Sequence, residues 1–330
     1  MGYCIVGVGA VKNEADIIEA HVRHNLRYLD RMILLDHDSS DATPRILQSL
    51  VDEGLPLTIS RLGRPEPTFK QAQFTTALAR GAFEKCSAHW VIPLDADEFV
   101  HAPSRDALET ALSGVSADVA SLRWQTYVPS PDGERGHPLR SLRWRVDTAK
   151  DPLSKALLSR RVLERDWRIG RGNHVVFEQA GNNLNWTVGE TLQDMMLAHL
   201  PLRSPEQLAA KALVGWSARR LTYGPMAETT TNSWHLRELC ARILAGEKIT
   251  PRDVHNYAIG IYALGRLPSA ADDGQFSLVE DQVAEAMPLR YTDDAPIDVA
   301  RQLAVWVSQM LDALMQTADA APSSAGPAHE

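Results

Sequence analysis

A hydrophobic run that ends in three carboxylates is the strongest constraint on how this 330-residue chain folds. The segment from Trp90 to Leu94 is largely apolar and leads directly into Asp95, Asp97 and Glu98. Such runs are typical of strands buried in parallel sheets, and ligands of open α/β sheets bind beyond the carboxyl ends of these strands. We therefore expect Asp95 and Asp97 at a ligand site, where a divalent cation would offset their mutual repulsion. The alternative is a strand followed by a polar helix N-terminus.

Two earlier apolar runs also end in polar residues. Residues 3–11 lead into Lys12-Asn13-Glu14, residues 31–35 lead into Asp36, and a helical pattern covers about 15–29 between them. Strand, helix and strand in this order form a right-handed βαβ unit whose polar strand ends lie on one edge. The side chains expected to converge at that edge are Asn13, Glu14, Asp36 and Asp97.

The alternation of strands and helices continues along the chain. We expect a helix at 44–50 with Thr43 as its cap, a short strand at 56–60 and a helix from 73 to 86. This order predicts an α/β fold with a nucleotide-binding sheet.

Three of these segments together resemble a known family, the metal-dependent glycosyltransferases of family 2 with the GT-A fold, and especially their bacterial branch with the signature Asp-x-Asp-Glu-Phe. The matching pieces are Val11-Lys12-Asn13-Glu14, Asp36 to Thr43, and Trp90 to Phe99, in the same order and spacing. The resemblance covers roughly residues 3–110. It implies a GT-A fold, which is α/β with a Rossmann-like nucleotide-binding sheet, and here a helical C-terminal region follows it. One departure is His37, where many relatives carry Asp or Asn.

The resemblance also implies an activity. A sugar would pass from a nucleoside-diphosphate-sugar donor to a hydroxyl acceptor, with inversion, and Mn²⁺ or Mg²⁺ would act as Lewis acid on the leaving diphosphate. Asp36 would address the base or ribose, and Asp95 with Asp97 would hold the metal. His199 would be a further ligand, which favours Mn²⁺, or else a structural histidine. The residues expected to contact the donor are Val11, Asn13, Glu14, Asp36, Lys70, Gln73, Asp95 and Ala96; Lys70 and Gln73 have helix capping as their alternative role.

No motif after Phe99 identifies the base that removes the acceptor proton. Such a base must reach the acceptor hydroxyl from the face opposite the leaving group. The candidates by position are Glu178, Asp194 and His174, and the last of these lies in a turn-like Gly-Arg-Gly-Asn-His segment.

Composition limits the classes of partner and compartment. The net charge of −8 and the pI near 5.8 argue against nucleic acid, which is bound through clustered basic residues. Three widely spaced cysteines indicate neither a disulfide framework nor a cysteine zinc site. Because no leader segment and no run of eighteen apolar residues is found, we expect a cytoplasmic protein without a membrane span. The expected partners are the nucleotide-sugar donor and a glycan, lipid-linked or other hydroxyl acceptor.

The sequence divides into four zones. We expect a nucleotide-sugar-binding half at 1–120, an acceptor-side half at 121–203, a helical region at 204–316 that includes a helix at 299–315, and a disordered tail at 317–330. Residues 121–186 form short strands rich in Arg and Trp. Their arginines and tryptophans belong either to a strand layer with one wet face and a Trp-filled core or to an acceptor cleft.

Two other functions keep the same fold. A nucleotidyltransferase would also place nucleotide and metal at these strand ends, but it usually carries a Gly-rich basic loop after the first strand, which this chain lacks. A non-catalytic nucleotide-sugar or glycan-binding protein would retain the site without turnover. A glycoside hydrolase with Asp97 and Glu98 as its acid pair is disfavoured, because neighbouring strand residues point to opposite faces.

Overall fold

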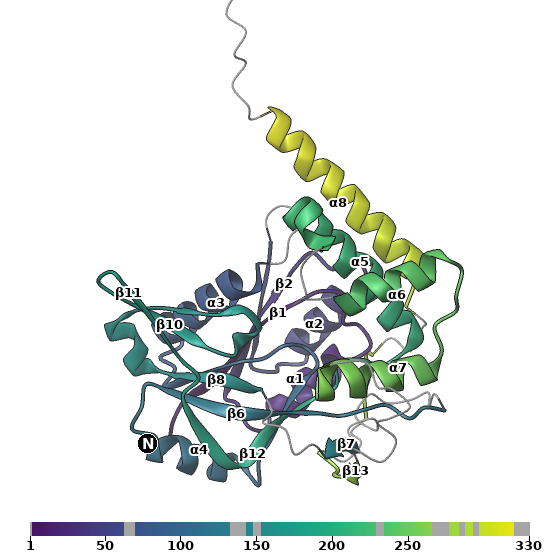
Figure 1. The fold of residues 1–330 in the computed structure, drawn as a ribbon. Coiled ribbons are helices and arrows are strands. Elements are labelled where there is room, and N and C mark those ends of the chain that lie inside the picture. Colours follow the sequence, from purple (N-terminus) through teal and green to yellow (C-terminus); the bar gives the residue numbers. More distant parts are fainter. Residues whose placement is uncertain are drawn as a thin grey trace, which may run out of the picture.

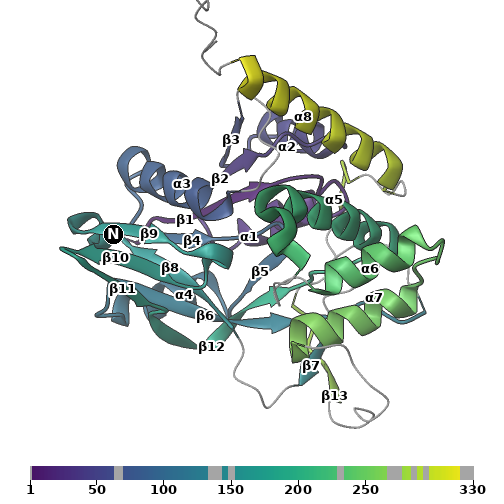
Figure 2. The same cartoon turned by 45° about the horizontal axis from the view of Figure 1, so that its top comes forward.

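The chain forms a mixed α/β structure around one large sheet, seen in Figures 1 and 2. The computed structural model describes residues 2–62, 70–132, 143–147, 153–228, 234–265, 277–283, 288–292 and 297–319. The large sheet has eight strands in the order β3-β2-β1-β4-β8-β6-β12-β5. The α/β fold class predicted from the sequence is therefore confirmed.

The first half of the sheet alternates parallel strands with helices. Its parallel strands are β1 (Ile5–Val11), β2 (Arg31–Asp36), β3 (Leu57–Arg61) and β4 (Trp90–Pro93), and its helices are α1 (Ile18–Asn25), α2 (Thr43–Asp52) and α3 (Gln71–Lys85). Alternate residues of β1 enter two different cores: Ile5 packs with α1 and α2, whereas Val6 and Val8 pack with α3. The order 3-2-1-4 places a topological switch point between β1 and β4, and ligands of such sheets bind there.

The two central strands approach each other closely at this switch point. Gly9 makes the approach possible, because a Cβ at this position would lie 2.2 Å from the carbonyl oxygen of Leu94. The glycine of β1 therefore serves strand packing directly below the site.

The second half of the sheet continues from β4 with mixed direction. Its strands are β8 (Ser154–Ser159), β6 (Val119–Thr126), β12 (Glu190–His199) and β5 (Glu98–His101), and α4 (Arg105–Gly114) follows β5. A three-stranded sheet is formed by β9 (Asp166–Ile169), β10 (Val176–Ala180) and β11 (Asn183–Thr187). The expected short strands of residues 121–186 are thus present, with Arg135, Arg140 and Lys150 outside the described residues.

Polar side chains of α1 hold β5 at the edge of the sheet. His21 Nδ1 donates to the carbonyl of Glu98 at 3.0 Å, and His24 Nε2 donates to that of Val100 at 2.7 Å. Asn25 accepts from the backbone N–H of Val100 and donates to Glu98. A covered edge strand cannot pair with another chain. Because β5 directly follows Asp97, these contacts also fix the segment that carries the strand-end acids.

The C-terminal region consists mainly of helices beside the strand ends. They are α5 (Pro205–Tyr223), α6 (Trp234–Leu244), α7 (Pro251–Tyr257), the π-helix η5 (Ala258–Leu264) and α8 (Val299–Asp319). The sequence prediction missed β13 (Ser277–Glu280), which pairs with β7 (Trp144–Asp147) outside the large sheet. The expected tail begins inside α8, and residues 320–330 lie outside the described part. No helix among the described residues is both long and apolar enough to span a bilayer.

A buried carboxylate ties this region to α1. Glu19 accepts the backbone N–H groups of Arg290, Tyr291 and Thr292 at 2.7–2.8 Å and pairs with Arg23. Burial alone would raise its pKa, but these donors outweigh burial and leave the pKa lowered. The segment that leads to α8 is thus anchored by a charge on the opposite end of the chain.

The two histidines under β5 predict that stability depends on pH. Burial lowers the pKa of His21 and of His24 to about 4, against about 6.5 in an unfolded chain. Between these two pKa values the unfolded state binds protons that the folded state does not bind. The free energy of unfolding should therefore decline as the pH falls from about 6.5 toward 4, by on the order of 3 kcal/mol for each imidazole. Urea unfolding at a series of pH values measures this. His24→Gln should flatten the decline, the exposed control His89→Gln should not, and an unchanged slope in His24→Gln would contradict the assignment.

Candidate functional site

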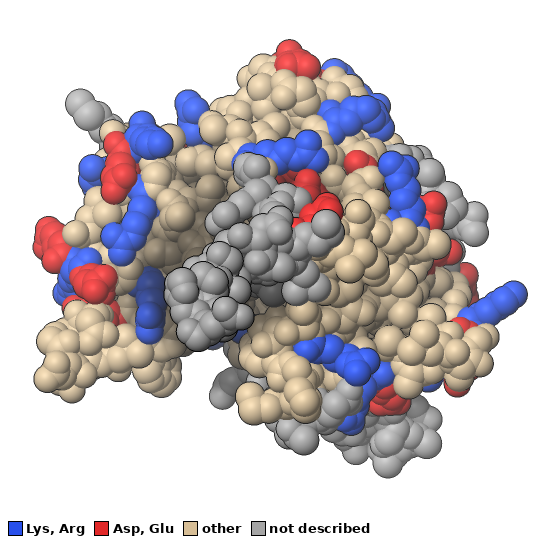
Figure 3. Space-filling model, turned by 90° about the horizontal axis from the view of Figure 1, so that it is seen from above, with Lys and Arg blue, Asp and Glu red and all other residues tan. Residues whose placement is uncertain are grey.

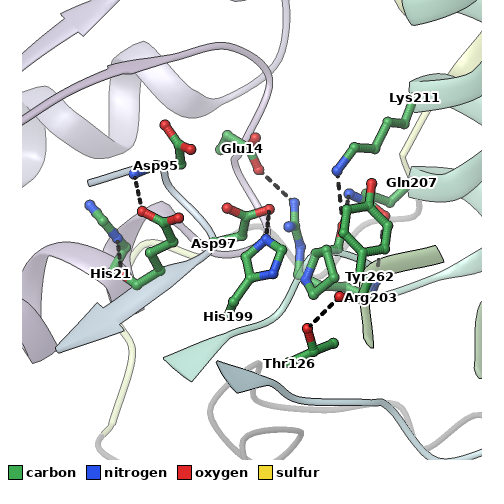
Figure 4. A network of polar contacts seen from close by, with 12 residues as sticks. Glu14, His21, Asp95, Asp97, Thr126, His199, Arg203, Gln207, Lys211 and Tyr262 are labelled. Atoms are coloured by element: carbon green, nitrogen blue, oxygen red, sulfur yellow. Dashed lines mark hydrogen bonds and ion pairs between the residues drawn. The ribbon is translucent and has the colours of Figure 1, made fainter. Parts of the chain in front are cut away.

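The predicted strand-end residues lie around one cavity of about 460 Å³. Asn13 and Glu14 follow β1, and Asp95 to Asp97 follow β4, on either side of the switch point. Figure 4 shows Asp97 facing His199 of β12, and Glu14 facing Arg203 in the loop between β12 and α5. The carboxyl ends of the first half thus meet the second half and the C-terminal region in this cavity.

The loops after β1 and β2 brace each other. Asn13 has φ 56°, a left-handed conformation that Asn tolerates. Its backbone N–H donates to Ser39 Oγ at 2.9 Å, and its side-chain oxygen accepts from Ser40 N at 2.8 Å. Thr43, expected as a helix cap, instead lies in the first turn of α2, where its hydroxyl accepts the N–H of Glu14. The cap prediction was wrong because a loop from the neighbouring strand uses the hydroxyl.

Asp36 lies at the end of β2 and is not among the residues that line the cavity. Its side chain is 1% exposed, pairs with Arg61 Nε at 3.0 Å and accepts from Ser39 N at 3.1 Å. The half-buried Asp38 in the same loop accepts a hydrogen bond from Gln309 of α8. The structure therefore brings Asp36 to the expected edge, and its contact with a nucleotide stays a prediction.

Asp95 is held by three donors from three elements. Gln71 Nε2 and Lys155 Nζ each lie 2.7 Å from its carboxylate, and Asn173 Nδ2 lies at 3.4 Å. Lys155 comes from β8, is fully buried, and also pairs with Glu98 at 2.6 Å. The expected metal ligand Asp95 is thus already engaged by an internal cation.

The charges of this cluster are coupled. Burial alone would lower the pKa of Lys155, but the carboxylates of Asp95 and Glu98 outweigh burial and raise it, so the amine stays charged. Burial raises the pKa of Glu98 to about 8, against the opposing charge of Lys155 and with the help of Asp95. One buried lysine therefore faces two acids, and Glu98 is the acid that holds its proton most readily.

Asp97 faces His199. Strand register sets this arrangement, because His199 of β12 pairs with Glu98 of β5 and Leu200 N donates to the carbonyl of Asp97 at 2.9 Å. Asp97 Oδ2 lies 3.5 Å from His199 Nε2. Burial would raise the pKa of Asp97, but His199, Lys211 and Arg203 hold it well below its usual range. Burial lowers the pKa of His199 against the pull of Asp97.

The donor atoms of Asp97 and His199 suit a divalent cation. A carboxylate oxygen and a neutral imidazole nitrogen are ligands that Mn²⁺ accepts, and cis ligands at about 2.1 Å from a metal lie roughly 3 Å apart. Their 3.5 Å separation is close to this spacing. The described residues contain no group of three or more His, Cys, Asp or Glu side chains placed to hold a metal. This pair would need further ligands from a substrate or water, and Asp95 would have to leave Lys155 to join it.

Cationic and aromatic side chains form the opposite wall. Arg203 donates to Glu14 at 2.6 Å and to Asp16 at 2.7 Å. Its Nη1 is buried without a hydrogen-bond partner among the described residues. Lys211 of α5 reaches the carbonyl of Pro201 at 3.2 Å. Burial raises the pKa of Glu14 to about 8 against the charge of Arg203. The wall therefore presents positive charge to the strand-end acids.

Two aromatic residues flank His199: Trp124, a tryptophan of the stretch for which an acceptor cleft was one interpretation, and Tyr262, which no sequence motif indicated. Trp124 of β6 stacks on His199 with ring centroids 3.8 Å apart, and Tyr262 meets the same ring edge-on at 5.6 Å. Tyr262 belongs to η5, and π-helical turns are frequent at functional sites. Its position depends on Thr126 Oγ1, which donates to the Tyr262 carbonyl at 3.2 Å.

The C-terminal helix completes the site from above. Gln302 lines the cavity, and Gln309 accepts from Lys12 Nζ at 3.3 Å and donates to the Asp38 carboxylate at 2.6 Å. Seen from this side, Lys and Arg side chains alternate with Asp and Glu rather than gathering into one patch (Figure 3).

Other predicted residues lie away from the cavity. Glu178 of β10 pairs with Arg165 at 3.0 Å and lines a second cavity of about 390 Å³. Asp194 is exposed at a bulge of β12 with φ 58°. His174 lies nearer, with Nδ1 2.9 Å from the Ser154 carbonyl and its ring edge-on to Trp124. Of these three alternatives for the base, His174 lies beside Trp124, which lines the cavity, and the choice of base stays a prediction. The remaining residues expected to contact the donor differ in position. Ala96 lines the cavity, and Val11 is buried at the end of β1. Lys70 and Gln73 are exposed at the start of α3, and the residue of this helix that reaches the site is Gln71.

Comparison with known proteins gives a limited picture. No protein-family model and no curated protein matches the chain. A mannosyltransferase from Pyrobaculum calidifontis, solved with GDP-Man and Mn²⁺, is similar at 17% identity over 74% of this chain and 75% of that one, with a TM-score of 0.39. TarS from S. aureus, residues 1–349 solved with UDP, is similar at 11% identity over 82% and 77% of the two chains, with a TM-score of 0.36. At these values neither structure establishes a family for this chain.

The buried cluster of Lys155 generates a prediction. Lys155→Met leaves Asp95 and Glu98 without their shared cation, so the free energy of unfolding should fall by about 3–5 kcal/mol. In the double variant Lys155→Met/Asp95→Asn most of this loss should be recovered, because Glu98, with its raised pKa, takes up a proton once the cation is gone and the amide removes the other carboxylate. Chemical denaturation of both variants tests this, with the exposed Lys85→Met as control. Equal losses in the single and double variants would show that packing, not charge, is responsible.

Proposed function

We propose that the protein is a glycosyltransferase that binds a nucleoside-diphosphate sugar in the cavity between β1 and β4 and passes the sugar to a hydroxyl acceptor. The pair of Asp97 and His199 at the switch point carries this proposal, because it sets a metal-binding oxygen and nitrogen beside the loop of Asn13 and Glu14. The resemblance of these strand-end motifs to family 2 glycosyltransferases supports the same function.

The residues of the cavity divide the work in this proposal. Asp97 and His199 would hold Mn²⁺ or Mg²⁺, which when bound stabilises the charge that develops on the leaving diphosphate. Arg203 and Lys211 place positive charge on the facing wall, which favours an anionic ligand in a buried site. Asp95, fixed by Lys155 and Gln71, orients its free lone pairs toward the donor. Trp124 and Tyr262 shape the acceptor side of the wall.

Nucleotide binding should depend on a divalent cation. We expect UDP, GDP, CDP or ADP to bind at least roughly tenfold more tightly with MnCl₂ than with EDTA, which is about 1.4 kcal/mol of binding free energy. Asp97→Asn and His199→Ala should each remove most of this difference, because each removes a metal ligand. Isothermal titration calorimetry measures it, with Asp194→Asn as the matched control. Equal affinities with EDTA and Mn²⁺ for every nucleotide would rule out the metal assignment.

Product analysis separates this function from its alternatives. A glycosyltransferase releases the nucleoside diphosphate from a sugar nucleotide, whereas a nucleotidyltransferase releases pyrophosphate from a nucleoside triphosphate and a sugar phosphate. A binding protein releases neither. Release of pyrophosphate would indicate a nucleotidyltransferase instead. Binding without any release, across a panel of sugar nucleotides and acceptors, would indicate a binding protein instead.

A further inference from the structure

The helix α8 is held to the rest of the protein by few buried side chains. Gln302 and Trp306 are the only buried residues over 299–313, and they lie one helical turn apart on the same face. Gln309 follows Trp306 by three positions and extends that face. A helix that belongs to a permanent core buries an apolar stripe, whereas elements that detach during function make few buried apolar contacts. The inner face of α8 is of the second kind.

Gln309 joins the loops that follow β1 and β2. Its amide oxygen accepts from Lys12 Nζ at 3.3 Å, and its Nε2 donates to the Asp38 carboxylate at 2.6 Å. Lys12 also lines the cavity of Asp97 and His199. One neutral side chain of α8 therefore occupies two charged side chains at the edge of that cavity.

The ammonium of Lys12 is poorly compensated while α8 is in this position. Burial lowers the pKa of Lys12, and the nearby charges of Asp38 and Asp36 do not outweigh this effect. Among the described residues, Gln309 is its only hydrogen-bond partner. A hydrogen bond between an ammonium and an anion is stronger than one to a neutral amide. An anionic ligand at Lys12 would therefore compete well with α8.

A nucleoside diphosphate in the proposed site would reach the same two side chains. Here the inference rests on the proposed function, which puts the diphosphate at Asp97 beyond β4. Because β4, β1 and β2 are neighbours in the sheet, β2 lies about 10 Å from β4. An extended nucleotide that starts at Asp97 and crosses β1 ends beside the loop of Asp38. The edge of a nucleobase carries a hydrogen-bond acceptor beside a donor, as the side-chain amide of Gln309 does.

We propose that α8 is an autoinhibitory helix: Gln309 takes the place of the nucleobase at Lys12 and Asp38, and the nucleotide must displace the helix to bind. The apparent affinity for the nucleotide is then reduced by the fraction of molecules in which α8 is detached. Figure 2 shows α8 on the outside of the molecule, and it packs on α5. Its departure would leave the strands of the large sheet in place.

The first experiment measures nucleotide affinity by calorimetry, with UDP, GDP, CDP and ADP in MnCl₂. Gln309→Ala frees Lys12 and Asp38, so the nucleotide that binds best should bind roughly fivefold more tightly or better. Trp306→Ala removes the buried aromatic ring of α8 without touching either charged side chain, and it should tighten binding in the same direction. The matched control is Ser308→Ala, an exposed neighbour on the same helix, which should leave the affinity unchanged.

The second experiment follows the helix itself by hydrogen exchange. In the full-length wild-type chain, saturating nucleotide should speed the exchange of backbone amides over 299–312, because binding shifts α8 to its detached state. A helix that instead closes over the nucleotide would exchange more slowly in the complex.

The two experiments together decide between these roles of α8. Tighter binding in Gln309→Ala and Trp306→Ala, with faster exchange of α8 in the complex, supports autoinhibition. Slower exchange, or weaker binding in Gln309→Ala, overturns it and makes α8 a wall of the occupied site. Equal nucleotide affinity in wild type and Gln309→Ala overturns this inference alone. Absence of nucleotide binding in wild type and in both variants overturns the proposed function as well.

Discussion

The buried ammonium of Lys155 joins the two halves of the large sheet at the point where the site forms. It comes from β8, the strand at which the parallel half of the sheet gives way to the mixed half, and its two carboxylate partners lie on either side of Asp97. A fully buried lysine is tolerated only when its partners outweigh the cost of desolvation. The position of Asp97, and through it the facing position of His199, therefore depends on an ion cluster that touches the cavity only through Asp95.

The sequence predicted the strands of the parallel half of the sheet well, for a physical reason. Buried parallel strands have apolar sequences, and their polar ends must lie on one edge of the sheet. Asn13, Glu14 and Asp97 could therefore be placed together from the local sequence pattern alone. Trp90 to Pro93 and Ile5 to Val11 are strands as expected. His199 was found only through family resemblance, since its approach to Asp97 depends on the pairing of β12 with β5.

Contacts between distant segments were not predictable in the same way. In the sequence, Lys155 is one of many basic residues in an Arg-rich stretch. No feature of the neighbouring sequence indicates that its side chain is buried against Asp95. Tyr262 depends on a π-helix that periodicity does not distinguish from an ordinary helix. Glu178 was chosen as a candidate base by position alone. Strand alternation turns its side chain toward Arg165 and away from the cavity, but this could not be predicted before the register of β10 was known.

The C-terminal region is part of the site rather than an appendage. Its approach is set by charge: Glu19 of α1 gathers three consecutive backbone N–H groups of residues 290–292, and α8 begins seven residues later. Gln309 then bridges Lys12 and Asp38, which follow two different strands. The contacts of Glu19 and of Gln309 are both polar and partly buried. Their hydrogen bonds therefore specify one position for α8, whereas apolar packing alone would allow the helix to slide. Because Gln302 of the same helix lines the cavity, the position of α8 also determines one wall of the site.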